Sequence, residues 1–147
     1  MNLEIAHGEF GQQRPGVTKP IPEFLIEMGE EGIRELISNH YDALRVSDIK
    51  HLFPIDEKDF EEAKKHSSDF MIQICGGPAY FNQNRGAPQM VGRHAPFRID
   101  AHARETWLSL YKPLLLELKE KGVTETSLKS FWGYINIFSI WMINTPN

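Results

Sequence analysis

The sequence has a single cysteine, no long apolar run and no excess of positive charge. Because Cys75 stands alone, an intrachain disulfide is excluded and a reducing compartment is favoured. No stretch approaches the roughly 20 apolar residues of a membrane-spanning helix, and the first residues lack the basic start and apolar run of a secretion signal. The formal net charge is -4 with both signs interspersed, which disfavours nucleic acid and anionic membranes as partners. We therefore expect a cytoplasmic protein.

Alternating strand patterns, internal repeats and low-complexity tracts are absent as well. Apolar residues instead recur at steps of three and four, which is typical of helices, and the length fits one domain with one core. The pattern predicts an all-α domain over residues 22–147. Its expected helices run from Pro22 to about Leu44 with a change of direction at Gly29–Gly32, from Asp56 to about Ile74, from Asp100 to Gly122 with a bend at Pro113, and onward from Thr124.

Two segments do not fit the helical pattern. Residues 1–21 contain three glycines and two prolines, so we interpret them as an N-terminal extension that is extended or disordered and adds nothing to the core. Residues 78–99 are also interrupted by glycine and proline, and no regular element is predicted there. Because this segment carries Tyr80, Phe81 and Phe97, it is too apolar for disorder and must pack on something.

The helix that follows Asp56 has small residues at two inward positions. Ala63 and Ser67 lie on its apolar stripe, where a helix packed directly on another normally carries Leu or Ile to reach interior density. The pattern indicates either a close crossing with a second helix or space for a flat, bulky ligand.

Six histidines are present, but none has the local spacing of a zinc or di-iron site, and no Gly-x-Ser-x-Gly turn indicates a hydrolase. We expect His40 and His66 to face solvent beside their helices' apolar stripes. His94 differs because Gly92 frees the backbone before it and Pro96 restricts the backbone after it. A histidine held in such a turn can present one nitrogen to a metal, or it can be an exposed side chain that bonds a helix cap.

A run of motifs extends through the chain: Tyr41, Phe53-Pro54, Gly76-Gly77-Pro78, Tyr80-Phe81, Arg85-Gly86-x-Pro88, Arg93-His94-Ala95-Pro96-Phe97-x-Ile99 and Trp107-Leu108. In order and spacing, over roughly residues 22–144, the run resembles the group II truncated haemoglobins. The resemblance implies a truncated globin fold, in which a two-over-two helical sandwich surrounds haem b and a largely irregular segment carries the proximal histidine.

Residue roles follow from the resemblance by position. His94 becomes the proximal ligand of the haem iron, and Tyr41 and Trp107 become hydrogen-bond donors to the distal ligand. Ser67 stands where the family usually has leucine or glutamine, and its hydroxyl adds a further donor. Arg93 and Arg98 either pair with the haem propionates or are ordinary solvated arginines beside the loop. The residues expected to line the haem pocket are Phe53, Ala63, Phe70, Met71 and Phe97.

These assignments predict a haem b protein that binds dioxygen and other small ligands with high affinity. A proximal histidine leaves the opposite axial position open, and two donors there would slow ligand escape. We expect redox chemistry such as peroxide or nitric oxide turnover, supported by an unidentified reductase. A haem-based gas sensor and a cofactor-free helical interaction module are the alternatives. Deletion of residues 1–19 is expected to leave the haem spectrum unchanged.

Overall fold

A computed structural model describes residues 1–147 and contains helices but no strands, which confirms the all-α prediction. None of these helices combines the length and hydropathy needed to cross a membrane. In chain order the elements are α1 (Pro22–Leu44), η1 (Lys50–Leu52), α2 (Glu57–Ile74), α3 (Tyr80–Arg85), α4 (Met90–His94), α5 (Ala101–Ser109), α6 (Lys112–Glu120), α7 (Glu125–Phe138) and η2 (Ser139–Met142).

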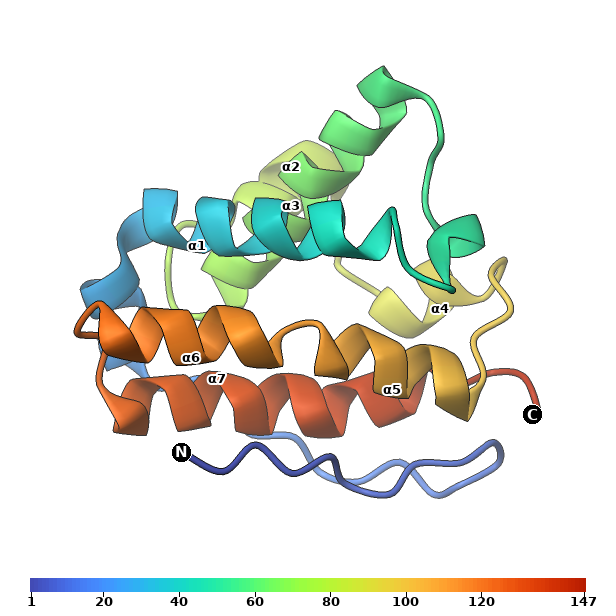
Figure 1. The fold of residues 1–147 in the computed structure, drawn as a ribbon. Helices are drawn as coiled ribbons and strands as arrows, with labels where there is room; N and C mark the ends of the chain where they lie inside the picture. Colours follow the sequence, from blue (N-terminus) through green and yellow to red (C-terminus); the bar gives the residue numbers. More distant parts are fainter.

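The long helices form two layers, and this confirms the predicted two-over-two sandwich. Figure 1 shows α1 and α2 crossing above, while α5 and α6 follow each other in line beside α7 below. The main core lies where α1 meets the lower layer. There the Phe24 and Phe131 rings stack with their centroids 4.9 Å apart, and both side chains are fully buried.

Local chemistry explains where most of these helices begin and break. Asp56 and Asp100 cap α2 and α5, because their carboxylates accept hydrogen bonds from the backbone N–H of Asp59 at 3.1 Å and Ala103 at 2.8 Å. Gly29 takes a positive φ of 68° inside α1, a conformation that glycine adopts without steric cost. The change of direction expected near this residue is therefore confirmed.

The segment between α2 and α5 is more regular than the sequence indicated. Two short helices, α3 and α4, form where no regular element was predicted. With six and five residues they are too short to show a helical period, and short helices depend on tertiary contacts for stability. Gln73 of α2 supplies such contacts, because its amide accepts from the Asn82 backbone N–H at 3.1 Å and donates to the Asn82 side chain at 3.0 Å.

Residues 1–21 lie extended beneath α7 (Figure 1), and the expectation that they add nothing to the core is wrong. The Leu3 side chain is buried in the main core. Side chains of the helical domain also satisfy backbone carbonyls of this segment: Trp132 Nε1 donates to Glu4 at 3.1 Å, and Trp141 Nε1 donates to Pro15 at 2.8 Å. Composition predicted the lack of secondary structure, but it carried no information about these long-range partners.

Deletion of residues 1–19 is expected to lower the free energy of unfolding by about 2–4 kcal/mol, because it exposes the surface under Leu3 and removes several hydrogen bonds. The absorption spectrum of the haem-loaded protein should still be unchanged, since no residue of this segment lines the large cavity described below. Urea titration and visible spectroscopy of the truncated protein measure the two effects separately. A truncated protein as stable as the full chain would contradict the packing role.

Asp69 ties α2 to its neighbours. Its side chain is only 2% exposed and accepts hydrogen bonds from Arg34 at 2.8 Å, Lys65 at 3.0 Å and Asn84 at 3.1 Å. Burial alone would raise the pKa of Asp69, but these hydrogen bonds outweigh it and hold the pKa below its usual value. The carboxylate is therefore a stabilising, paired charge at neutral pH.

Asp69→Asn is expected to reduce the free energy of unfolding at neutral pH by roughly 1–3 kcal/mol, because the amide keeps the shape but loses the charge. Because the pKa of Asp69 is lower in the folded state, this stabilisation is complete above the unfolded-state pKa of about 4. It is lost as the pH falls through the pKa of the folded state. Urea titrations at decreasing pH should show the two proteins converging in acid. A difference that persists unchanged to the acid limit would exclude the titration of Asp69 as its origin.

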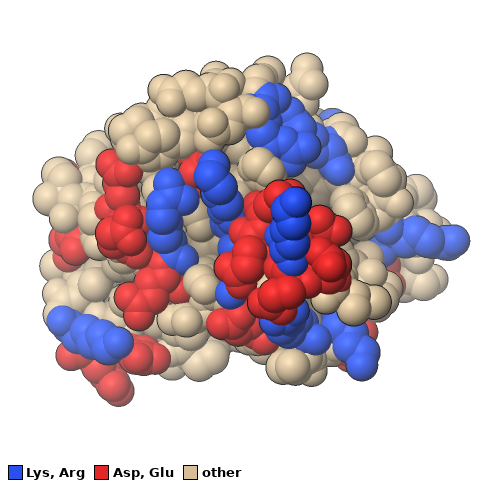
Figure 2. All heavy atoms as spheres, turned by 90° about the horizontal axis from the view of Figure 1, so that it is seen from above, with Lys and Arg blue, Asp and Glu red and all other residues tan.

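Surface charges of both signs are interleaved. Figure 2 shows acidic and basic side chains alternating over the upper face of the molecule, and neither sign forms a continuous patch there. Several charges of the molecule are paired; Lys121 Nζ lies 2.9 Å from Glu117, and Lys129 Nζ lies 3.5 Å from Glu125. Such exposed pairs contribute little to stability, and the interleaved charges leave the upper face without the field that attracts polyanions.

Candidate functional site

A cavity of about 370 Å³ lies between the two helical layers, a size typical of cofactor pockets. Of its 26 lining residues 18 are hydrophobic, so it suits a large apolar group with a few polar contacts. Every candidate residue from the sequence except Arg98 lines this one cavity. Those brought together are Tyr41, Phe53, Ala63, Ser67, Phe70, Met71, Arg93, His94, Phe97 and Trp107.

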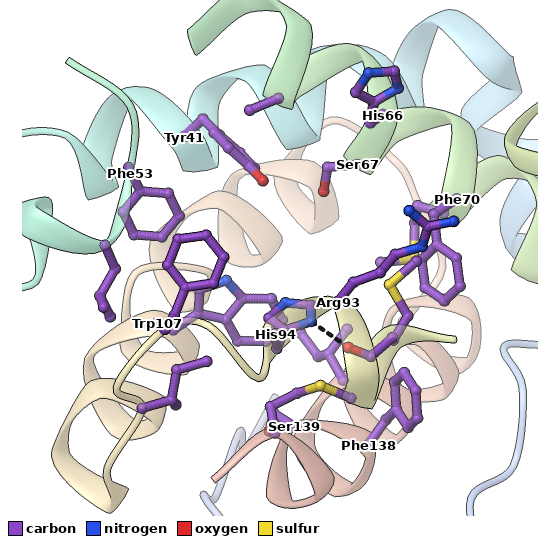
Figure 3. A pocket seen from close by; sticks show the side chains of 18 of the residues that line it. Tyr41, Phe53, His66, Ser67, Phe70, Arg93, His94, Trp107, Phe138 and Ser139 are labelled. Carbon is purple, nitrogen blue, oxygen red and sulfur yellow. Dashed lines mark hydrogen bonds between the residues drawn. The ribbon is translucent and has the colours of Figure 1, made fainter. Parts of the chain in front are cut away.

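His94 is the last residue of α4 and is half-buried at the lower wall of the cavity (Figure 3). Its Nδ1 lies 2.6 Å from the Met90 carbonyl oxygen. Because a carbonyl can only accept, Nδ1 must carry the proton and donate. A neutral imidazole then has a free lone pair on Nε2, which is the arrangement that a hydrogen bond from the other ring nitrogen imposes on metal-binding histidines.

The chain after His94 is held by a residue that sequence reasoning missed. Asn144 Nδ2 donates to the carbonyls of His94 at 3.2 Å and Phe97 at 2.8 Å, and its Oδ1 accepts from the Ile99 backbone N–H at 2.9 Å. Asn144 therefore anchors the loop that connects α4 to α5 across a separation of 50 residues. No local pattern in the sequence could have indicated this pairing.

Polar side chains reach the cavity from the opposite layer. Figure 3 shows the hydroxyls of Tyr41 on α1 and Ser67 on α2 pointing into it from that layer, while the indole of Trp107 reaches the cavity from α5 in the lower layer. Burial raises the pKa of Tyr41, and the neighbouring Ser67 hydroxyl partly offsets this effect. The phenol therefore stays protonated and keeps its donor at neutral pH.

Aromatic contacts shape the rest of the wall. The Phe53 ring meets Tyr41 edge-on with centroids 5.5 Å apart, and Phe70 packs between Phe81 at 5.9 Å and Phe138 at 6.5 Å. Phe97 remains 46% exposed at the rim. Sequence reasoning missed Phe138, although its place on the apolar stripe of the last helix was a signal that it faces inward.

The three arginines near the rim have different surroundings. Arg93 already donates to the carbonyls of Pro88 at 2.6 Å, Arg85 at 2.9 Å and Ala87 at 3.0 Å, so it stabilises the loop before α4. Arg98 is exposed and lines a neighbouring shallow hollow instead of the cavity. Arg85 was not predicted as a site residue, but it is exposed at the rim and lines the cavity.

Two histidines expected to face solvent do not. His40 is completely buried, and burial lowers its pKa to about 3. His66 lines the cavity, and its Nδ1 is buried without a partner; burial, followed by the charge of Arg85, lowers its pKa. Both lie at the edge of an apolar stripe, since His40 follows Ile37 by three residues and His66 follows Ala63 by three, so helical spacing alone did not decide whether they are buried.

Comparison with known proteins identifies the family to which this architecture belongs. The bacterial-like globin family model matches residues 27–144. The group 2 truncated haemoglobin YjbI of Bacillus subtilis strain 168 is 33% identical over 117 residues, which are 80% of this chain and 85% of that protein. The chain belongs to the group II truncated haemoglobins.

Solved structures place this truncated haemoglobin among globins. The crystal structure of phosphate-bound Hell's gate globin IV has a TM-score of 0.85 and 36% identity, over 98% of this chain and 88% of that one. The truncated oxygen-avid haemoglobin of Bacillus subtilis has a TM-score of 0.71 and 25% identity, over 82% of this chain and 98% of that one. Family membership implies binding of small ligands through haem.

The residues of this truncated haemoglobin fit such a group. No three His, Cys, Asp or Glu side chains lie together in a way that could hold a bare metal ion. A haem brings four nitrogens of its own and needs one ligand from the protein, which the free Nε2 of His94 can supply. The apolar walls suit the porphyrin, and the basic rim suits its carboxylates.

Proposed function

We propose that the protein is a haem b protein that binds dioxygen and other small ligands with high affinity, with His94 as the proximal ligand. The observation that carries this proposal is the 2.6 Å hydrogen bond from His94 Nδ1 to the Met90 carbonyl. This hydrogen bond leaves the lone pair of the neutral ring on Nε2, and it orients the imidazole from within α4. Haem, when bound, would supply an iron that can take a diatomic ligand.

Tyr41 and Trp107 act on that ligand as hydrogen-bond donors. Each neutral hydrogen bond contributes about 0.5–1.5 kcal/mol, and more when charge develops on the acceptor. Since about 1.4 kcal/mol corresponds to a tenfold change, the pair would slow dissociation by one to two orders of magnitude. The Bacillus subtilis relative is described as oxygen-avid, which supports high oxygen affinity as part of this proposal. Ser67 contributes a third donor, a hydroxyl that can hold the Tyr41 phenol or a water in place.

The haem carboxylates would be held at the basic rim. Arg93 donates to three backbone carbonyls from Nε and Nη2, so the predicted contact with a propionate would use the N–H groups of its Nη1. Arg98 stays a prediction as well, and it requires its side chain to turn from the neighbouring hollow. We add Arg85, which lines the cavity and is exposed at its rim, as a further propionate partner.

The same donors support redox turnover of peroxide or nitric oxide. Donors aimed at a position where charge develops stabilise that charge without reorganising during the reaction. Electrons would come from a reductase partner. A gas sensor would need a change of shape that reaches an output domain, and no feature of the site favours it over turnover.

Two measurements test this function. Purified protein titrated with haem b should bind one equivalent and give the visible spectrum of histidine-ligated haem, whereas a cofactor-free interaction module would give no saturable spectrum. Stopped-flow mixing of the oxygenated protein with nitric oxide, beside a peroxidase assay, then compares the two reactions. Fast, stoichiometric nitrate formation supports nitric oxide oxidation, and slow reaction in both assays would remove the redox part of the proposal.

A further inference from the structure

A break between two helices leaves the Trp107 carbonyl without its helical partner. In a continuous α-helix this carbonyl would accept from the backbone N–H of Tyr111. That N–H donates to the Leu108 carbonyl at 3.0 Å instead, because α5 ends at Ser109 and α6 begins only at Lys112. Pro113 has no N–H for the Ser109 carbonyl, which favours a break in the helix at this point. A buried carbonyl at this point therefore needs a donor from elsewhere.

His40 of α1 supplies that donor. Its Nε2 lies 2.8 Å from the Trp107 carbonyl oxygen, so Nε2 must carry the proton. The imidazole is fully buried, stacks on the Tyr111 ring with centroids 3.5 Å apart, and meets the Trp107 indole edge-on at 5.2 Å. One side chain of the upper layer thus contacts both the backbone and the ring of Trp107 in the lower layer.

The other ring nitrogen of His40, Nδ1, makes a histidine at this position energetically costly. His40 Nδ1 is buried and has no hydrogen-bond partner, and a buried polar atom without a partner is destabilising. An apolar side chain of similar size would fill the same space without that cost. Burial also lowers the pKa of His40 to about 3, so the ring stays neutral. The Nε2 donor is the property of histidine that an apolar residue could not replace.

His40 and Tyr41 are neighbours on α1. We propose that His40 is a positioning residue that fixes Trp107 on α5 relative to Tyr41, and so sets the geometry of the two donors to the distal ligand. This inference rests on the proposed function, because that function makes Tyr41 and Trp107 donors to the bound ligand. His40 does not line the cavity, so it acts through Trp107 and not by contact with the ligand.

Two variants of His40 isolate the donor. His40→Leu removes the hydrogen bond, whereas His40→Gln keeps an N–H at a similar reach, and both lose the stacking on Tyr111. We expect His40→Leu to raise the oxygen dissociation rate about 3- to 10-fold, which corresponds to the loss of one well-placed hydrogen bond. His40→Gln should stay within about twofold of the natural protein. The carbon monoxide stretching frequency of the CO complex should shift in the leucine variant alone, because that frequency reports the field from distal donors.

A double mutant separates positioning from general stability. In a Trp107→Phe background, His40→Leu should change the dissociation rate no further, because the donor it positions is gone. Equal rates in the leucine and glutamine variants, or an additive effect in the double mutant, would overturn the inference. If Trp107→Phe changes the rate and His40→Leu does not, this inference fails alone; if neither does, the donor role proposed for Trp107 fails with it.

The tautomer gives a test that needs no substitution. Nitrogen-15 NMR of the haem-loaded natural protein should show His40 with a protonated Nε2 and an unprotonated Nδ1, unchanged from about pH 5 to pH 8. A protonated Nδ1, or titration of the ring in this range, would overturn the inference even if His40→Leu failed to fold.

Discussion

Replacement of His94 by alanine is expected to abolish the spectrum of histidine-ligated haem and to weaken haem affinity by more than about 100-fold. Loss of an outer-sphere hydrogen bond alone typically costs 10- to 100-fold in metal affinity, so loss of the ligand itself should cost more. No other histidine of the cavity has an Nδ1 bonded to a carbonyl in the way that Met90 holds His94. Haem titration followed by visible absorption measures both effects.

His66→Ala is the matched control, because His66 lines the same cavity and its removal leaves the proximal wall intact. That variant should bind haem with an unchanged spectrum. Added imidazole should restore an axial nitrogen to His94→Ala by occupying the vacated space. If His94→Ala retained the spectrum and His66→Ala lost it, His66 and not His94 would be the proximal ligand.

Trp107→Phe is expected to leave haem binding intact while it accelerates oxygen dissociation, by roughly 3- to 100-fold. Phenylalanine keeps most of the apolar bulk of the indole and removes the only donor that the side chain has. Tyr41→Phe should have a similar effect through loss of the phenolic donor. The magnitude spans the range from a neutral to a charge-assisted hydrogen bond. Ligand-replacement stopped flow measures each rate, and an unchanged rate in Trp107→Phe would make Trp107 a packing residue.

The two donor substitutions should not be additive, because both side chains serve one acceptor. The double variant therefore tests whether they share a ligand. Ala63→Leu is the control for access, since it narrows the cavity and removes no donor. It should slow association and leave dissociation nearly unchanged. A faster dissociation rate in Ala63→Leu would show that crowding alone disturbs the bound ligand.

Sequence patterns located the site largely because its chemistry depends on residue type. Tyr41 lies on the apolar stripe of its helix, and this periodicity predicted that it faces inward. Ala63 and Ser67 left two explanations open, a close helix crossing or a bulky ligand. The structure places both residues on the wall of a large cavity, which supports the second. The resemblance to truncated haemoglobins assigns Tyr41, Ala63 and Ser67 to one haem site.

His40 and Arg98 show where the sequence was insufficient. Whether a residue at the edge of an apolar stripe is buried depends on how its helix is rotated against its neighbours, and the break after α5 gave His40 a carbonyl to bind. Arg98 follows the motif, but its side chain turns to a different hollow. A residue's distance along the chain does not determine the direction of a long, exposed side chain.

The sequence by itself determined the helical class, most helix limits, the family and the position of the single constrained histidine, because periodicity, caps and motifs are local. Only the tertiary structure decided that residues 1–21 pack beneath α7, that α3 and α4 form, and that Asn144 holds the chain after His94. Each of these depends on hydrogen bonds or burial between parts of the chain that no short pattern relates. Burial of His40 belongs with them, since its energy comes from partners 67 residues away.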